Sequence, residues 1–474
     1  MRTTLEPAEF LRRYPDYANT RSLDRLRDTE YSYLDEQGHT YLDYTGAGLA
    51  ARSQYRAHQE RLHGGVFGNP HSINPTSAAS TELVEGARRA VLRHLNADPD
   101  EYVAIFTANA TAAARLVGEA YPFGRGTRFV LTFDNHNSIN GIREFARAAR
   151  ARTTYLPVEP PDLRASTAAV DQALARGKGL FAYPAQSNFS GVQHPLEWVG
   201  RAQARGYDVL LDCAAFLPTN RLDLSAVRPA FVIASWYKVF GYPTGVGCLV
   251  ARRDALARLR RPWFSGGTIK AVSVQARWHA MAAAEAAFED GTVNFLSIPD
   301  VRVGLEWVAE VGVETIGRRV RAVTGWTLDR LTALRHGNGM PLVRVYGPVT
   351  TVARGGTVTF NVLTPAGDVV DERVVAAESS AVGISLRTGC FCNPGAGENA
   401  FGLEKRALRG LRRARVRSLD EYLLLVGLPT AGAVRVSFGV ASTVGDVERF
   451  IRFAEATYRD RVPDTSGLPP REQC

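Results

Sequence analysis

Short apolar runs alternate with amphipathic stretches over the first half of the chain. Runs of this length that are rich in β-branched and aromatic residues are typical of buried strands. They lie at 103–107, 128–133, 153–158, 179–184, 207–212 and 231–236. Between several of them, apolar residues recur about one helical turn apart, most clearly over 81–95 and 140–151. Strands separated by helices predict βαβ units, a mostly parallel sheet and an α/β fold.

The pattern changes after about residue 300, where a long helical stretch precedes strands with alternating polarity. These later elements are expected at 301–336 (helix), 357–363 and 432–439 (strands) and 444–458 (helix). Strands and helices that no longer alternate regularly predict a separate α+β unit. The expected parts are an N-terminal segment packing with the small domain (1–40), a large domain (41–300), a small α+β domain (301–460) and a flexible, Pro- and Gly-rich tail (461–474).

Composition narrows the class of protein. A chain of 474 residues is long enough for two or three domains. Its 45% hydrophobic and 22% charged residues are ordinary for a globular protein and argue against disorder. No apolar run approaches the roughly 20 residues of a membrane helix, and the N-terminus lacks the apolar centre of a signal peptide. Five cysteines do not form a disulfide framework, so a cytoplasmic location is expected.

The net charge of +9 raises the question of a polyanionic partner. Much of it comes from 404–417, EKRALRGLRRARVR, which predicts a basic helix. No interleaved aromatic residues or nucleic-acid-binding motif accompany this stretch, so a solvated helix face is the favoured interpretation. An acidic carrier protein or sulfur acceptor docking there is a minor alternative. We expect neither nucleic acid nor membrane as a partner.

The chain contains only four lysines, and one of them lies in a position suited to chemistry. Lys238, in ASWYKVFGYPTGVG, follows an apolar strand and precedes a Gly-rich loop. Ligands in α/β sheets bind at such strand-to-loop junctions. A desolvated lysine there is an activated amine nucleophile. The alternative is an ordinary surface lysine, and position alone does not decide between them.

Asp212 favours the chemical interpretation. It ends the strand YDVLLD, and one βαβ turn would bring it to the same sheet edge as Lys238. An aspartate in this place can pair with the protonated ring nitrogen of pyridoxal phosphate (PLP). Taken alone, Asp212 is better explained as a helix N-cap or a polar residue at a strand end. Together with Lys238, it favours the interpretation as a PLP-binding residue.

Other strand ends supply a phosphate site and an aromatic ring. FTANATAAAR (106–115) combines a strand end, a small-residue turn and a helix start that carries Thr111, and Ser235 adds a hydroxyl. Helix N-termini with hydroxyl groups bind phosphate, although each such residue is equally a common helix cap. His136, in TFDNHNSINGIRE, follows a third strand and could stack on a cofactor ring, whereas a lone histidine is more often structural.

Taken together, these motifs resemble a known family. ASWYK, LLDCAAF, FTANAT and FDNH, in combination, are similar to the class V aminotransferase fold, which includes the cysteine desulfurases. The resemblance is strongest to the desulfurase domain of molybdenum cofactor sulfurases and spans roughly 38–455. It is carried by FAYPAQSNFSG (181–191), YKVFGYPTGVG (237–247), FEDGTVNFLSIP (288–299) and RTGCFCNPGAG (387–397). It implies a fold-type I PLP-dependent transferase, with a mostly parallel seven-stranded sheet in the large domain and a smaller α+β domain.

The resemblance also implies roles for individual residues. Lys238 would be the Schiff-base lysine, Asp212 the partner of the pyridine nitrogen and His136 the stacking ring. Thr268 would reach the phosphate of a neighbouring subunit, which implies a homodimer. Further cofactor contacts would come from Ala110, Thr111, Asn188, Ala214, Ser235 and Tyr237. The substrate would be bound by Arg387, Arg435, Asn188 and Ala47.

Two cysteines in RTGCFCNPGAG decide between reactions. In the similar desulfurases a loop cysteine accepts sulfur as a persulfide, and Cys392 falls on that position, with Cys390 just before it. The pair could also be a zinc half-site, but no second Cys/His pair with ligand spacing lies near, and we expect no metal. Two buried structural thiols are the other alternative. Beside Arg387, a thiolate favoured by positive charge is the preferred interpretation.

The sequence differs from the similar proteins at two positions. The similar sulfurases carry a further cysteine shortly after this motif, where Gly397 stands here, and many desulfurases have a glutamine at the position of Ala215.

The expected function is therefore a PLP-dependent cysteine desulfurase or related C–S lyase. It would take sulfur from L-cysteine or an analogue, release alanine and pass the sulfur to an acceptor, either a small molecule or a carrier protein. One alternative is another amino-acid reaction on the same scaffold: elimination, transamination, racemisation or bond formation. Another, of a different class, is a catalytically silent scaffold protein.

Overall fold

The computed structural model describes residues 8–70, 72–403, 408, 415–428, 430–468 and 470–471. Its large sheet has seven strands in the order β2-β8-β7-β6-β5-β3-β4. They are β2 (Tyr102–Thr107), β3 (Arg128–Thr132), β4 (Arg152–Leu156), β5 (Gly179–Pro184), β6 (Tyr207–Asp212), β7 (Phe231–Ser235) and β8 (Gly247–Arg252). Only β8 runs antiparallel to its neighbours, β2 and β7. The predicted α/β fold with a mostly parallel seven-stranded sheet is confirmed, and β8 is the one strand of this sheet that the apolar runs did not predict.

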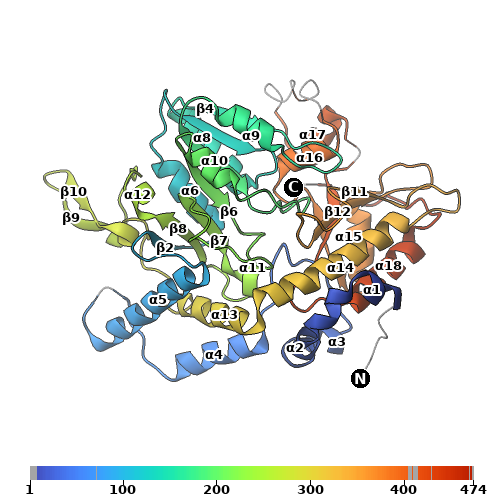
Figure 1. Cartoon of the computed structure of the whole chain (residues 1–474), viewed down its shortest axis with the longest axis horizontal. Helices are drawn as coiled ribbons and strands as arrows, with labels where there is room; N and C mark the ends of the chain where they lie inside the picture. The colour runs from blue at the N-terminus through green and yellow to red at the C-terminus, as the bar shows by residue number, and fades with distance from the viewer. Residues whose placement is uncertain are drawn as a thin grey trace.

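Helices cover both faces of this sheet (Figure 1). Neighbouring residues of a strand point to opposite faces; in β6, Val209 and Leu211 join one apolar cluster and Leu210 joins another. The first cluster includes α5 and α13, and the second includes α6 and α8. The helices around the sheet are α5 (Pro75–His94), α6 (Ala110–Ala120), α8 (Ile142–Ala148), α9 (Thr167–Leu174), α10 (Trp198–Gln203), α12 (Arg253–Leu256) and α13 (Ile298–Val311).

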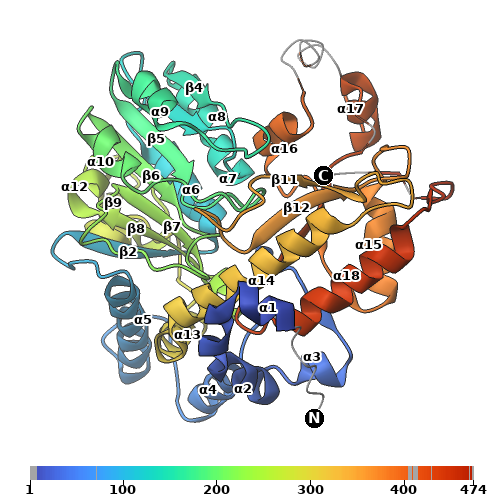
Figure 2. The ribbon, with the colours of Figure 1, turned by 45° about the vertical axis from the view of Figure 1, so that its right-hand side comes forward.

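The small domain is built on an antiparallel sheet in the order β11-β12-β15-β14. Figure 2 shows this sheet beside the large one, with α14 running across the small sheet. The strands are β11 (Val343–Tyr346), β12 (Thr357–Val362), β14 (Arg387–Gly389) and β15 (Ala433–Ser437). The helices are α14 (Val313–Ala333), α15 (Glu372–Ala381), α17 (Leu419–Val426) and α18 (Val444–Tyr458).

The N-terminal segment packs in the same apolar cluster as α14 and α18. Phe10 and Tyr17 are buried in one apolar cluster with Trp326 and Phe450. The segment continues as β1, which pairs in parallel with β13, and then passes towards the large domain. Its elements are α1 (Ala8–Arg13), α2 (Ser22–Glu30), α3 (Tyr33–Glu36), β1 (Thr40–Tyr41) and α4 (Arg52–His63), and the partner strand is β13 (Ile384–Ser385).

Two surface features differ from the expectations or add to them. A hairpin of β9 (Ile269–Ser273) and β10 (Trp278–Met281), which the sequence pattern did not predict, projects from the large domain (Figure 1). In the segment expected to be a flexible tail, Arg471 is ion-paired with Asp371, Glu372 and Asp420. The expected basic helix over 404–417 lies largely outside the described residues. None of the described helices is long and apolar enough to cross a bilayer.

Candidate active site

A cavity of about 400 Å³ lies at the edge of the large sheet where β5, β6 and β7 end. This volume is within the range of small-molecule sites. The parallel strands bring distant residues together here because their carboxyl ends meet at one edge. Nine residues predicted for the site line it: Ala110, Thr111, His136, Asn188, Asp212, Ala214, Ser235, Tyr237 and Lys238.

Lys238 lies on α11 (Trp236–Phe240), a single turn of helix that follows β7 directly. The apolar residues Trp236, Val239 and Phe240 are buried and fix this turn against the core. Burial lowers the pKa of the Lys238 amine; Arg435 lowers it as well, while Asp212, Asp43 and Cys392 act in the opposite direction. A lowered pKa increases the neutral, nucleophilic fraction of the amine.

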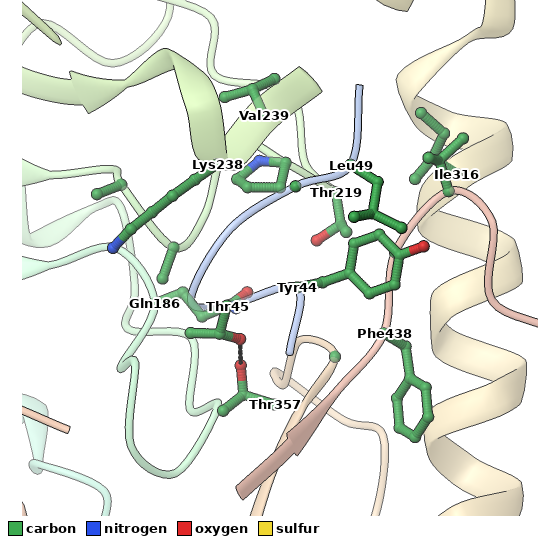
Figure 3. Close-up of a pocket in the computed structure, with 17 residues that line it drawn as sticks. Tyr44, Thr45, Leu49, Gln186, Thr219, Lys238, Val239, Ile316, Thr357 and Phe438 are labelled. Carbon is green, nitrogen blue, oxygen red and sulfur yellow. Dashed lines mark hydrogen bonds between the residues drawn. The ribbon is translucent and has the colours of Figure 1, made fainter. Parts of the chain in front are cut away.

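A second, much smaller cavity of about 20 Å³ lies on the other side of the Lys238 stem. Figure 3 shows the amine directed away from Tyr44, Leu49 and Phe438, which line that space. There is room for about one water molecule, so an amino acid cannot enter. The lysine therefore presents its amine only to the larger cavity.

Asp212 is a buried carboxylate with no cationic hydrogen-bond partner among the described residues. Its Oδ1 accepts the N–H of Ala214 at 2.9 Å, and no described residue donates to Oδ2. Burial raises the pKa of Asp212, an effect opposed by this hydrogen bond and by the charge of Lys238. A protonated pyridine nitrogen would supply the missing donor and charge, so this end of the cavity fits the ring of PLP.

The opposite end of the cavity suits a phosphate group. Helix α6 begins at Ala110. The Asn109 side chain accepts the N–H of Ala112 at 2.9 Å, whereas the N–H groups of Ala110 and Thr111 have no acceptor among the described residues. The helix comes close to β8 because Gly247 has no side chain: a Cβ there would lie 2.3 Å from the carbonyl carbon of Asn109. The hydroxyls of Thr111 and Ser138 lie 2.7 Å apart beside this helix start. Free N–H groups with hydroxyls are the donors that bind phosphate.

His136 lies at the rim of the same cavity, as the N-cap of α7 (Asn137–Asn140). Its Nδ1 accepts the N–H of Ser138 at 3.1 Å, which fixes the orientation of the ring. Burial lowers the pKa of His136 to about 4, and the charges of Lys238 and Arg435 contribute to this. At neutral pH the ring is uncharged and can stack on a flat aromatic group.

The two predicted carboxylate-binding arginines lie side by side, but both already hold a carboxylate of this chain. Asp43 Oδ2 accepts from Arg387 Nε at 3.0 Å, and Asp43 Oδ1 accepts from Arg435 Nη2 at 3.1 Å. Arg435 Nη1 also donates to the Asn188 carbonyl at 3.0 Å, which connects the pair to the cavity. Burial lowers the pKa of Arg435, whereas the hydrogen bonds to Asp43 raise that of Arg387.

The cysteine loop between β14 and α16 (Pro394–Ala400) is docked against the cavity. The Asn188 side chain donates to the Phe391 carbonyl at 2.8 Å, and the N–H of Asn137 donates to the Cys392 carbonyl at 2.7 Å. Phe391 and Cys392 have φ values of 55° and 52°, in the left-handed region. Two successive non-glycine residues in this region store backbone strain, as is common at functional sites.

The two cysteines of this loop differ. Cys392 has a free, exposed thiol, whereas Cys390 is disulfide-bonded. This separates two residues that the sequence treated as a possible pair. Of the predicted residues outside the cavity lining, Ala47 lies on the loop that carries Asp43, and Thr268 is buried at the start of β9, where its Oγ1 accepts the N–H of Ser265. Among the described residues, no cluster of His, Cys, Asp or Glu could hold a metal ion.

Several residues of this site were not predicted from the sequence. Asp43 is one of them, four residues before Ala47 in YLDYTGAG. Gln186 and Asn393 lie within two motifs of the family resemblance, FAYPAQSNFSG and RTGCFCNPGAG. Gln186 lines both cavities, and Asn393 donates to the Asp134 carbonyl and to the Asn188 side chain, each at 2.8 Å. Their polar side chains in otherwise apolar or small-residue stretches were the available signal.

Several known proteins are similar to this chain in sequence, and others are similar to it in fold. Molybdenum cofactor sulfurase of Arabidopsis thaliana is 35% identical over 494 residues, which cover 95% of this chain and 60% of that protein. The chain thus spans less than two thirds of that relative. A cysteine desulfurase from Thermococcus onnurineus superposes with a TM-score of 0.77 at 23% identity, over 92% of this chain and 98% of that one.

A second solved structure gives the same fold. A mutant of the protein C-DES, solved with glycine covalently linked to its PLP cofactor, superposes with a TM-score of 0.68 at 18% identity, over 90% of this chain and 99% of that one. Residues 40–450 match the family described as aminotransferase class-V. The chain belongs to the aminotransferase class-V family.

Proposed function

We propose that the protein is a PLP-dependent cysteine desulfurase that takes sulfur from L-cysteine and releases alanine. The observation that carries this proposal is the free thiol of Cys392 on a loop docked against the cavity that holds Lys238. The similarity to a molybdenum cofactor sulfurase and the fold of cysteine desulfurases support it.

The residues that line the cavity have separate roles in the proposed reaction. PLP, when bound, acts as an electron sink that makes bonds at the amino-acid α- and β-carbons labile. Asp212 would hold the proton on its ring nitrogen, the start of α6 would hold its phosphate, and the uncharged ring of His136 would stack on its ring. The lowered pKa of Lys238 suits its amine to bind the cofactor, remove the α-proton and return a proton to carbon.

Cys392 receives the sulfur. Its thiolate attacks the sulfur of the substrate; the substrate Cβ–S bond breaks and a new S–S bond forms. The electron pair of the broken bond stays with the carbon fragment, which takes up a proton and leaves as alanine. L-Cysteine and the Cys392 thiol thus become alanine and a Cys392 persulfide. A thiol of a small molecule or a carrier protein then removes the outer sulfur.

Incubation of the holoenzyme with L-cysteine tests this directly. We expect alanine and a persulfide on Cys392, detected by alkylation and peptide mass spectrometry. Cys392→Ala should lose the persulfide and nearly all alanine formation, because no other described cysteine is both free and exposed. Cys248→Ala, at a buried free thiol, is the matched control and should leave the reaction unchanged. Pyruvate, ammonia and free sulfide, formed equally well by Cys392→Ala, would show elimination instead.

We also propose that the active unit is a homodimer in which Thr268 contacts the phosphate bound by the partner. Thr268 is fully buried in the single chain, does not line the cavity of its own chain, and its hydroxyl accepts the N–H of Ser265. The resemblance of the sequence to the desulfurases supports the contact. Sedimentation should give twice the mass of one chain. Thr268→Ala should weaken PLP binding about tenfold, roughly the value of one charge-assisted hydrogen bond. Thr268→Ser should retain it. A monomer, or equal PLP affinity in Thr268→Ala, would contradict the proposal.

A further inference from the structure

Two arginine side chains near the cavity share a single carboxylate. Arg387 and Arg435 are direct cross-strand partners in β14 and β15, so their guanidinium groups lie on the same face of the small sheet. Asp43 is inserted between them from 344 residues earlier in the chain. Each of its oxygens faces one guanidinium, with Arg387 Nη2 at 2.5 Å from Oδ2 and Arg435 Nη2 at 3.1 Å from Oδ1.

The loop around Asp43 holds this carboxylate in place. The N–H groups of Gly46 and Ala47 donate to the Asp43 carbonyl at 2.9 and 3.1 Å. A Cβ on Gly46 would lie 2.5 Å from Asp43 Oδ2 and 2.7 Å from Arg387 Nη2, so a side chain there would displace the ion pair. The side chains of Asp43 and Arg435 are 9% and 4% exposed. A buried carboxylate placed this way is a constant part of the site, unlike a surface ion pair.

The charges do not cancel. Two guanidinium groups and one carboxylate leave a net charge of +1 in the cluster. Burial limits how far water can screen Asp43 and Arg435, whereas the Arg387 side chain is half-exposed. Arg435 Nε is buried and has no hydrogen-bond partner among the described residues. A buried donor without a partner is costly. One carboxylate of a bound ligand would neutralise the remaining positive charge and accept a hydrogen bond from Arg435 Nε. A second carboxylate on the same ligand would find no further cation in this cluster.

We propose that Asp43 is a specificity-determining residue that restricts the site to amino acids with a single carboxylate. This inference rests on the proposed function, in which the α-carboxylate of an amino acid binds next to Arg387 and Arg435. Asp43 removes one of the two positive charges that a dicarboxylic amino acid would otherwise find. L-Cysteine, with an uncharged side chain, matches the remaining charge.

Calorimetric titration of the holoenzyme with L-alanine and L-aspartate tests the proposal without any sulfur chemistry. The wild type should bind L-alanine more tightly than L-aspartate. Asp43→Asn raises the net charge of the cluster by one, so affinity for L-aspartate relative to L-alanine should rise at least about tenfold. The double variant Asp43→Asn/Arg387→Gln returns the net charge to +1 and should recover the wild-type preference. Asp35→Asn removes another Asp–Arg pair in the N-terminal segment and controls for destabilisation.

The outcomes separate the two proposals. An unchanged ratio in folded Asp43→Asn overturns the role of Asp43 while the desulfurase function stands. If Asp43→Asn does not fold, the double variant decides: preference for L-alanine supports the proposal, and equal binding of both amino acids overturns it. A wild-type holoenzyme that binds neither amino acid overturns the proposed function, and the inference with it.

Discussion

Lys238→Ala is expected to lower the rate of alanine formation by about 10²- to 10⁴-fold, the range that a lost general acid–base group produces. It is the only lysine in the lining of the large cavity, and its stem is enclosed so that the amine reaches no other space. The variant should also lose the covalent link to PLP. Borohydride reduction of the wild-type holoenzyme, followed by peptide mass spectrometry, should place the cofactor on Lys238.

Lys178→Ala is the matched control. Lys178 is exposed before β5, and only its backbone carbonyl contributes a hydrogen bond, to the N–H of Arg128. Its replacement should change neither rate nor labelling. A Lys238→Ala variant that retains the wild-type rate, or a label found on another lysine, would contradict the assignment.

Gly395→Ala is expected to reduce persulfide formation on Cys392 by about 100-fold, the effect of misplacing a reacting group by around 1 Å. Gly395 lies in the first turn of α16, directly after the cysteine loop. A Cβ at this position would lie 2.0 Å from the carbonyl oxygen of Phe133, at the end of β3. Because the clash is with a backbone oxygen rather than a flexible side chain, α16 and the loop before it must move away from the cavity.

Gly397→Ala is the control within the same helix, because a Cβ there meets only the Phe401 ring at 3.6 Å. It should behave like the wild type. Persulfide formation is measured under single-turnover conditions, and PLP affinity is measured in parallel. Gly395→Ala should keep its PLP, since the loop does not contribute to the cofactor cavity lining. Equal rates in the two alanine variants would show that the loop position does not limit sulfur transfer.

The contrast between Lys238 and Asp43 shows how far local sequence signals reach. Lys238 follows an apolar strand, Asp212 ends another, and the strand ends of a parallel sheet must meet at one edge. This rule requires only the strand positions, which apolar runs reveal. Asp43 follows a two-residue strand, and its partners Arg387 and Arg435 are 344 and 392 positions away. No local pattern brings such residues together.

The cysteine loop is an intermediate case. The resemblance placed Cys390 and Cys392 together and left their roles open. In the structure Cys392 has a free, exposed thiol and Cys390 a disulfide bond. The hydrogen bonds that dock the loop come from Asn137 and Asn188, which belong to different segments of the large domain. The docking therefore depends on how the two domains pack.

By itself, the sequence determined the α/β class, six of the seven strands of the large sheet and the cluster of polar residues at its edge, because apolar runs and helical apolar patterns encode which faces are buried. Only the tertiary structure decided the charge of the carboxylate site. Asp43 neutralises one of two arginines because the N-terminal segment packs on the small domain and delivers its loop between β14, β15 and the cavity. Electrostatic pairing depends on distance in space, and chain position does not specify it until the domains are packed.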